Sequence, residues 1–355
     1  MFIFDKGNLT GVDIGSYAVK VMKIKGTTDK RSLEAVGYSK LNHLTFPEDN
    51  SRVSEILRNL LSTHRIKTKK AAAVLPGGSF TMAHLYLPNM PKKDMKEAVR
   101  WEMRKQITFS PEELVCDFTT IGEIKRGEES MLSLIAFCAQ KKDTNQLIKI
   151  LEDALLEPLI IDVAPMAMLA CFDYNNVWEN GVNYSMIDIG DSKSTLAVFK
   201  DRKLMFAREI AIGGREMTMA VMNKLACAED VAEKEKIRCE ISSGSNQKDR
   251  RSEAEQEIID TVSGVVERLA AEVHRSFDYY QAQFREGSVS KIFLCGGSSR
   301  LKGIDSFFEN IIRIPCFIDD PLRNIKVEPK KFEAMKIREF APDLVVTVGL
   351  ALKCQ

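Results

Sequence analysis

Two short stretches of the chain repeat each other almost half its length apart. Residues 12–16 read Val-Asp-Ile-Gly-Ser, and residues 187–191 read Ile-Asp-Ile-Gly-Asp. Each predicts an apolar strand that delivers an Asp and then a tight turn with Gly, and a second strand follows at 19–24 and at 194–199. A repeated strand–turn–strand hairpin with an acid at its tip indicates two similar lobes that close on one ligand. That ligand needs a cation, backbone N–H groups or both, and a nucleoside triphosphate with Mg²⁺ is the obvious candidate.

The composition is that of an ordinary globular protein. The 355 residues are 45% hydrophobic and 28% charged, which is enough for two sizeable cores. The formal net charge is +1, so the sequence predicts no general attraction to nucleic acid or to acidic lipid. Basic and aromatic residues do not alternate in the way that favours nucleic-acid binding.

The cysteines and the N-terminus indicate where such a chain works. Eight cysteines occur without a Cys-x-x-Cys pair, mostly in apolar runs, and we interpret them as buried free thiols in a reducing cytosol rather than disulfides or zinc ligands. The first residues do not resemble a signal peptide. The apolar stretches are shorter than the roughly 20 residues of a membrane-spanning helix. We therefore expect a cytoplasmic protein without direct membrane insertion, which reaches the membrane through a partner.

The first half predicts a lobe at 1–182 that carries an inserted module. The lobe elements are a hairpin at 10–25, a strand at 33–41, an amphipathic helix at 51–65 and a buried strand at 71–75. The pattern then changes, and residues 88–156 predict a small α+β subdomain. Its expected elements are a helix at 88–107, strands at 114–121 and 131–138, and a helix at 143–156.

The second half predicts a similar lobe at 183–355. Helical segments follow its hairpin, and a small subdomain on the ligand side is expected at about 214–265. The polar stretch 242–251 predicts a mobile loop. The remaining expected elements are a long helix at 254–285, a strand at 291–295, a helix at 303–312, a strand at 343–348 and a helical end at 349–352. Strands alternate with helices in both halves, which predicts an α/β fold with two related lobes around a cleft.

The hairpin residues have the chemistry that a magnesium nucleotide needs. Asp13 and Asp188 could hold Mg²⁺ through water, because this ion often binds through one or two carboxylates plus phosphate oxygens. Lys20 could reach a phosphate as a point charge. Small residues at the turns leave room for phosphate or donate hydrogen bonds to it: Gly15, Ser16, Gly190, Ser194 and Thr195. Taken singly, each Asp-x-Gly more often makes only a turn.

Two further segments could contact a nucleotide. Gly296 and Gly297 end an apolar strand and could admit a flat base, and Arg300 could stack on it. Glu233 and Lys236 lie on one helix face and could bind ribose hydroxyls. Considered alone, the first segment is more often a loop and the second a solvated helix face. The chain contains no Gly-x-x-x-x-Gly-Lys-Ser/Thr loop, no Gly-x-Gly-x-x-Gly fingerprint, no Gly-x-Ser-x-Gly elbow and no histidine metal spacing.

The order of these pieces resembles the actin-like ATPase superfamily, whose ribonuclease H-like fold is shared by sugar kinases, Hsp70 chaperones, actin and the division protein FtsA. The resemblance implies that 12–20 and 187–198 are the two phosphate motifs and that 292–304 is the adenosine motif. It also implies that 157–171 and 342–353 are the two connecting helices that hinge the lobes.

Within that superfamily the chain resembles the PilM family of type IV pilus assembly. The resemblance rests on the stretches 11–20, 87–102, 161–163, 212–218 and 232–236. It implies that the chain binds ATP, with Gly213 and Gly214 also in the site, Glu233 and Lys236 at the ribose, and Gly296, Gly297 and Arg300 at the adenosine.

The family resemblance also implies partners. The main one is the cytoplasmic N-terminal tail of a PilN-like inner-membrane protein, in a groove near 84–110. Pilus motor ATPases and self-association are further possibilities. The expected location is the cytoplasm, at the inner face of the cell membrane.

Two departures from the family pattern bear on turnover. Asp191 stands where many relatives have a small residue, and its charge would repel a terminal phosphate unless Mg²⁺ or Lys20 compensates. Ala164 stands where pilus relatives often carry an acid. Both predict nucleotide binding with at most weak ATPase activity. The alternatives are an FtsA-like division protein and, third, a small-molecule kinase, for which we find no catalytic Asp in the first lobe.

Overall fold

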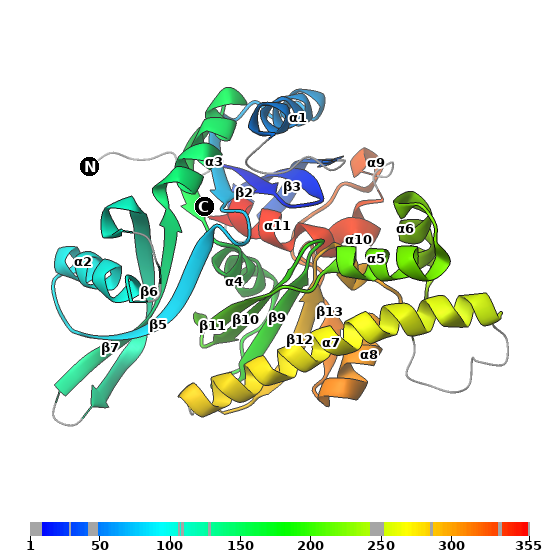
Figure 1. The fold of residues 1–355 in the computed structure, drawn as a ribbon. Coiled ribbons are helices and arrows are strands. Elements are labelled where there is room, and N and C mark those ends of the chain that lie inside the picture. The colour runs from blue at the N-terminus through cyan, green and yellow to red at the C-terminus, as the bar shows by residue number, and fades with distance from the viewer. Residues whose placement is uncertain are drawn as a thin grey trace.

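Two five-stranded sheets and one three-stranded sheet organise the computed structural model of the chain (Figure 1). The structure describes residues 9–27, 30–41, 49–105, 107, 110–126, 129–241, 252–284, 287–332 and 336–353. The α/β class and the two related lobes with an added module, expected from the sequence, are confirmed by this arrangement.

The first sheet has the strand order β3-β2-β1-β4-β8. Its strands are β1 (Thr10–Ile14), β2 (Ala18–Thr27), β3 (Lys30–Lys40), β4 (Lys70–Val74) and β8 (Glu157–Asp162). The hairpin partner β2 runs antiparallel to β1, whereas β4 and β8 run parallel. Residues 71–74 are buried, as expected for a parallel strand with both faces covered.

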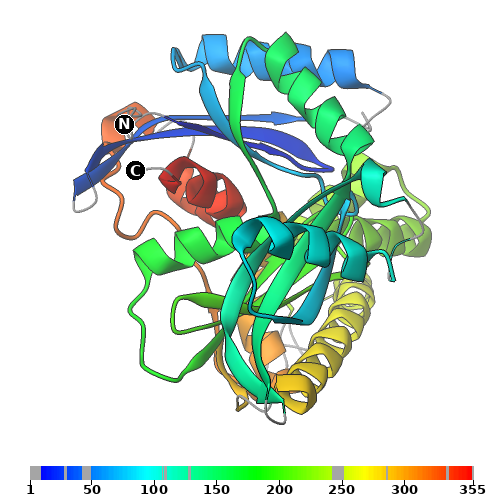
Figure 2. The same cartoon turned by 90° about the vertical axis from the view of Figure 1, so that its left-hand side faces the viewer.

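Helices cover both faces of this sheet (Figure 2). The helices α1 (Asn50–Thr63) and α3 (Lys141–Asp153) share one core with it. The helices α4 (Ala164–Asn175) and α11 (Val345–Leu352) pack against each other on the other face and share a core with the second sheet. This helix pair therefore connects the two lobes.

The second sheet repeats the plan of the first, with the order β11-β10-β9-β12-β13. Its strands are β9 (Asn183–Ile189), β10 (Ser194–Lys200), β11 (Lys203–Ile210), β12 (Val289–Cys295) and β13 (Cys316–Ile318). The central strand β9 again has an antiparallel hairpin partner, β10, and a parallel neighbour, β12. The duplication expected from the two hairpins is confirmed.

Helices α5 (Gly214–Leu225), α7 (Glu253–Phe284) and α8 (Ile304–Ile312) cover the outer face of the second sheet. The apolar stripe that predicted α7 is buried along its length, since a 3.6-residue period places these side chains on one face. Short helical elements complete the lobe: α6 (Glu229–Arg238), η3 (Gly297–Arg300), α9 (Pro329–Phe332), α10 (Ile337–Phe340) and η5 (Ala341–Leu344).

We call the third sheet with its helix the insert. Its strands pair in the order β5 (Phe80–Pro88), β7 (Glu129–Gln140) and β6 (Leu114–Arg126). Helix α2 (Lys92–Met103) packs on these strands and shares a separate core with them. The short η1 (Pro111–Glu113) leads into β6. The sheet thus begins at Phe80, ahead of the expected boundary at 88, and α3 packs with the first lobe. The lobe boundaries at 182 and 183 remain predictions.

Three predicted elements differ in the structure. Residues 343–348 are not a strand, because 341–344 form a 3-10 turn and α11 begins at Val345. The β-branched residues of this run are buried where α11 packs against α4, and this burial outweighs their strand propensity. Residues 157–162 form β8 rather than part of a connecting helix. The predicted helix at 88–107 is shorter and begins after Pro91, which occupies its N-cap. The predicted loop at 242–251 lies outside the described residues.

The cysteine prediction is wrong for one pair. Cys116 on β6 and Cys138 on β7 form a disulfide, with Cα atoms 4.2 Å apart. The antiparallel register places them directly opposite each other, a pairing that their apolar sequence neighbours did not reveal. Free thiols are described at Cys171, Cys227, Cys239, Cys295 and Cys316.

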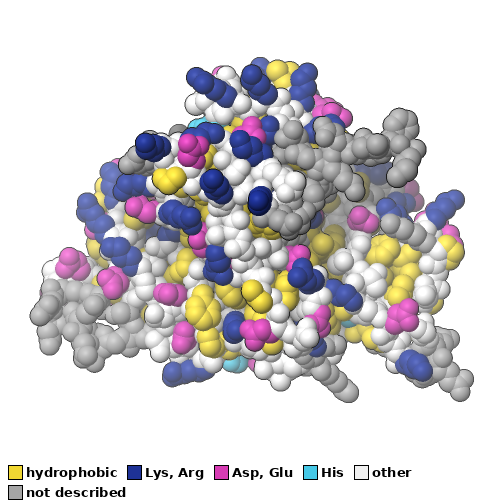
Figure 3. All heavy atoms as spheres, turned by 180° about the vertical axis from the view of Figure 1, so that it is seen from behind, with side chains coloured by type: hydrophobic (Ala, Val, Ile, Leu, Met, Phe, Trp, Pro, Cys, Tyr) yellow, Lys and Arg dark blue, Asp and Glu magenta, His cyan; other side chains and the backbone are white. Residues whose placement is uncertain are grey.

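The charges on the surface are mixed, as the formal net charge of +1 predicts (Figure 3). The face shown in Figure 3 carries Lys and Arg side chains interspersed with Asp and Glu. Among the described helices, none is both long enough and apolar enough to cross a membrane.

Candidate functional site

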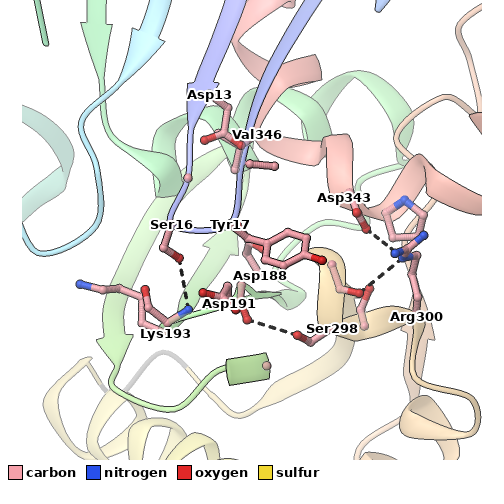
Figure 4. A pocket seen from close by; sticks show the side chains of 18 of the residues that line it. Asp13, Ser16, Tyr17, Asp188, Asp191, Lys193, Ser298, Arg300, Asp343 and Val346 are labelled. Atoms are coloured by element: carbon pink, nitrogen blue, oxygen red, sulfur yellow. Dashed lines mark hydrogen bonds and ion pairs between the residues drawn. The ribbon is translucent and has the colours of Figure 1, made fainter. Parts of the chain in front are cut away.

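A cleft of about 1060 Å³ lies between the two hairpins and extends to η3 and α6. Its volume is at the upper end of the range typical of small-molecule sites. Residues from both lobes line it, including most of those predicted from the sequence: Asp13, Gly15, Ser16, Lys20, Asp188, Gly190, Thr195, Gly214, Glu233, Lys236, Gly297 and Arg300. Segments from far apart in the chain therefore meet at one site (Figure 4).

Three predicted residues stand behind the cleft lining. Ser194 Oγ donates to the Ile212 carbonyl at 2.7 Å and so ties the second hairpin to the loop before α5. Gly213 is the N-cap of α5 and passes close to the Asp191 carbonyl. Gly296 has φ +82°, and a Cβ there would lie 2.1 Å from Asp188 Oδ1. These residues position the lining residues instead of facing the cleft themselves.

The first hairpin carries a matched charge pair. Asp13 on β1 lies opposite Lys20 on β2, and Lys20 Nζ donates to Asp13 Oδ2 at 3.1 Å. Both side chains are largely buried. Burial lowers the pKa of Lys20, but the carboxylates of Asp13, Asp343 and Asp188 raise it by more, so that its pKa lies well above the ordinary value. Lys20 is therefore a permanent positive charge on the cleft wall.

The second hairpin places Asp188 near that same cation. Burial raises the pKa of Asp188 to about 6; Lys20 lowers it, whereas the charges of Asp13 and Asp343 raise it further. A cation bound between Asp13 and Asp188 would relieve this repulsion. No group of three or more His, Cys, Asp or Glu side chains arranged for a metal occurs in the described part of the chain. A metal held by the two carboxylates would need oxygen atoms from phosphate or water to complete its shell.

Asp191 has a partner that the sequence analysis did not consider. Arg215, in the first turn of α5, places Nε 3.4 Å from Asp191 Oδ2. Burial raises the pKa of Asp191, while Arg215 and Lys236 lower it. The acid expected to depend on Mg²⁺ or Lys20 for compensation is thus countered by a cation from its own lobe.

Glu233 and Lys236 are joined in a polar network between α5 and α6. Lys236 Nζ donates to Glu233 Oε2 at 2.6 Å and to Thr218 Oγ1 at 2.9 Å, and Thr218 donates to the same carboxylate oxygen at 2.6 Å. Both charged side chains are more than two-thirds covered. The solvated-face interpretation is therefore wrong, because α5 packs on this side of α6.

Arg300 lies at the opposite side of the cleft from Lys193 (Figure 4). Its Nε is 3.3 Å from Asp343 Oδ1, and its guanidinium lies over the Phe340 ring at 5.5 Å. Burial raises the pKa of Asp343, which Arg300 and Lys20 lower. The arginine is thus held in place by two residues of the C-terminal segment, which also lines the cleft.

Sequence reasoning missed several of these residues. Asp343 was assigned to a strand, and its place beside Arg300 depends on a contact between distant segments. Arg215 follows Gly213-Gly214 at the start of a helix, where a cation is unfavourable beside the positive end of the helix dipole and so indicates an acidic partner. Lys193, inside the second hairpin turn, pairs with Glu209 at 3.2 Å, a partner that no pattern in the sequence indicates.

A family model described as type IV pilus assembly protein PilM matches residues 11–355. The chain belongs to the PilM family. This match covers the stretches on which the family resemblance rested, and it confirms the expected family.

Solved structures agree on the fold. A PilM–PilN type IV pilus biogenesis complex is 24% identical, with 98% of each chain covered and a TM-score of 0.85. The ethanolamine utilization protein EutJ from Carboxydothermus hydrogenoformans is 15% identical, with 97% and 89% covered and a TM-score of 0.58. MreB5 of Spiroplasma citri bound to AMPPNP is 13% identical, with 98% and 95% covered and a TM-score of 0.55. At these identities the likeness establishes the actin-like fold.

Proposed function

We propose that this PilM-family chain is a cytoplasmic scaffold that binds ATP with Mg²⁺ and holds the N-terminal tail of a PilN-like membrane protein. The observation that carries the nucleotide part is the convergence of two phosphate-type hairpins, η3 and the α5–α6 network on one cleft. A solved relative with the same fold is bound to AMPPNP, which supports a nucleotide in the corresponding cleft here.

The phosphates would lie between the hairpin turns. Gly15 and Gly190 bring bare backbone to the cleft wall, and Lys20 supplies a fixed positive charge there. Ser16 and Thr195 add hydroxyl groups. A polyanion needs such donors and charges, because its own charge must be balanced when water leaves the cleft.

The sugar and base would lie toward α6 and η3. Glu233 and Lys236 present a carboxylate and an ammonium at the cleft side of α6, the combination that hydrogen-bonds ribose hydroxyls. Arg300, whose guanidinium lies over the Phe340 ring, offers a planar cation to an adenine face. Gly297 leaves space beside it.

The carboxylates fit a hard divalent ion. Asp13 and Asp188 both line the cleft, and burial, together with the charges of Asp13 and Asp343, raises the pKa of Asp188. Mg²⁺ at this position would neutralise phosphate charge when bound. Ala164 also lines the cleft and cannot orient an attacking water, so we retain the prediction of weak ATPase activity.

The partner tail is proposed to bind near residues 84–110. The solved PilM–PilN complex has the same fold over nearly the whole chain, which supports a PilN-like partner. In this region Trp101 of α2 is 55% exposed, with the Arg104 guanidinium 5.3 Å from its ring. An exposed aromatic beside an arginine is a typical anchor for a peptide. Binding to such a partner would place the chain at the inner face of the membrane.

The nucleotide proposal is tested by calorimetric titration of ATP with Mg²⁺ into the wild type and Asp13→Ala. We expect the variant to bind at least about 10-fold more weakly, because one charge-assisted contact contributes on the order of 1.5–3 kcal/mol. Asp260→Ala, at an exposed site on α7, is the matched control and should keep wild-type affinity. Equal ATP affinity for Asp13→Ala and the control would refute the cleft assignment.

The partner proposal is tested with a labelled peptide of the PilN-like tail. We expect Trp101→Ala to lower its affinity about 10-fold or more. Tyr279→Ala removes an equally exposed aromatic on α7 and should have no effect. If the tail is not retained by the wild-type chain with ATP and Mg²⁺ present, the partner proposal fails while the fold stands.

A further inference from the structure

A contact at the mouth of the cleft joins the two lobes. We call the four residues Gly77, Gly78, Lys193 and Glu209 the clasp. The Gly78 N–H, in the loop between β4 and β5, donates to both carboxylate oxygens of Glu209, at 3.0 and 3.2 Å. Lys193, in the second hairpin turn, pairs with Glu209 at 3.2 Å. The clasp thus links a first-lobe loop to two charged residues of the second lobe.

The glycines are there because the lysine crosses them closely. A Cβ at Gly77 would lie 2.7 Å from Glu209 Oε1 and 2.8 Å from Lys193 Cδ. Gly78 has φ +86°, and a Cβ there would lie 2.8 Å from Lys193 Nζ. A side chain at Gly77 would displace the Lys193 and Glu209 side chains, and one at Gly78 would in addition strain the backbone.

Both halves of the clasp continue directly into the insert. Gly78 stands just before β5, the first strand of the insert sheet. Glu209 lies near the end of β11, whose first residue, Lys203, donates to the Ile121 carbonyl of β6 at 2.7 Å. Strand β11 also contacts β5 and β7. A shift of Glu209 would therefore move β11 at the surface where the insert contacts the second lobe.

The charges of the clasp make it responsive to an anion. Lys193 lines the cleft, and its side chain is 28% exposed, so it can leave Glu209 without a large desolvation penalty. Lys193 and Arg300 lie on opposite sides of the cleft (Figure 4). A nucleotide with its base at Arg300 would extend its phosphates toward the Lys193 side of the cleft (Figure 4).

We propose that the clasp reports the terminal phosphate of the bound nucleotide to the insert. Lys193 leaves Glu209 and pairs with the terminal phosphate, so that Glu209 keeps only the Gly78 N–H. Strand β11 then shifts where it contacts the insert. The inference rests on the proposed function and deepens it, since it names the residues that couple the two binding events. Coupling of this kind is reciprocal and is typically 5- to 150-fold.

The test measures affinity for the PilN-like tail peptide with Mg²⁺ plus either AMPPNP or ADP. For the wild type we expect at least about 5-fold tighter peptide binding with AMPPNP. Lys193→Met and Glu209→Gln should each bring the two affinities within about twofold of each other. Lys291→Met, which breaks an exposed ion pair with Glu179 outside the cleft, is the matched control and should keep the wild-type difference.

The outcomes separate the two proposals. If the wild type distinguishes AMPPNP from ADP and both clasp variants still do so, the clasp inference is wrong. If the wild type binds nucleotide and peptide but does not distinguish the nucleotides, the inference is also wrong and the proposed function stands. If the wild type binds neither ligand, both fail. Thermal unfolding of each variant checks that a lost difference does not reflect a lost fold.

Discussion

The two cleft hairpins share a backbone plan but differ in how they balance their charge. In the first, Asp13 lies opposite Lys20 in the strand register. In the second, the position opposite Asp188 is Thr195, so this hairpin has no cation of its own facing the acid. Its charges are balanced from outside the hairpin, by Lys20 of the first lobe for Asp188 and by Arg215 of α5 for Asp191.

The difference indicates which lobe depends on the other. In the first hairpin, Asp13 has its counter-ion within the hairpin itself. In the second, Asp188 and Asp191 have their counter-ions only when Lys20 and α5 are in place. A ligand cation between Asp13 and Asp188 would therefore stabilise the closed arrangement more than either lobe alone. Nucleotide with Mg²⁺ bound there would shift the population toward closed molecules.

The largest expected effect comes from removing the shared cation. Lys20→Met leaves Asp13 and Asp188 without their common counter-ion, and we expect a loss of about 3 kcal/mol in unfolding free energy, because an uncompensated buried charge remains. Urea unfolding at neutral pH measures this loss. The double variant Asp13→Asn with Lys20→Met should recover part of it, and additive losses would contradict the pairing.

The pH dependence of stability distinguishes the effect of burying Asp319 from the effect of the hairpin carboxylates. Asp319, at the end of β13 and outside both hairpins, is 1% exposed, and burial raises its pKa from 3.8 to about 6. The folded state therefore binds this proton more tightly than the unfolded state does. Its contribution to stability is complete below about pH 4 and is lost as the pH rises to about 6, a change of about 3 kcal/mol.

The measurement is the free energy of unfolding between pH 4 and 7 with a chelator present. Asp319→Asn should flatten the decline in stability relative to the wild type, whereas Asp260→Asn, at an exposed position, should not. Any decline that remains in Asp319→Asn is expected to come from Asp188, whose pKa is raised to a similar value, and from Asp191 and Asp343, whose pKa values burial also raises. An unchanged decline in Asp319→Asn would show that burial does not raise the pKa of this carboxyl.

The smallest expected effect tests the partner of Asp191. Arg215→Ala leaves the negative charge of Asp191 in the cleft without its ion-pair partner. We expect ATP affinity to fall by only about 3- to 10-fold, because the Arg215 and Asp191 side chains are both partly solvated. Titration of ATP measures the change. Adding Asp191→Ala to the same chain should restore the affinity, and a further loss in the double variant would show that Asp191 itself assists binding.

Much of the site was predictable because it is local in sequence. The Asp-x-Gly turns, the strands beside them and the glycines after β12 are short patterns with a period of two or a turn preference, and they fix which residues face the cleft. The strand assigned at 343–348 failed for the opposite reason. An apolar, β-branched run cannot be distinguished from a buried helix by its pattern alone, and the packing of α11 against α4 decided it.

The sequence by itself determined the two hairpins, their register and hence the Asp13–Lys20 pair, because neighbouring strands joined by a tight turn leave little freedom. Only the tertiary structure decided the contacts between distant segments. These are Arg215 at Asp191, Asp343 at Arg300, Glu209 at Gly78 and the Cys116–Cys138 disulfide. Each joins groups whose spacing in the chain carries no periodic signal, so their meeting depends on how the lobes and the insert pack.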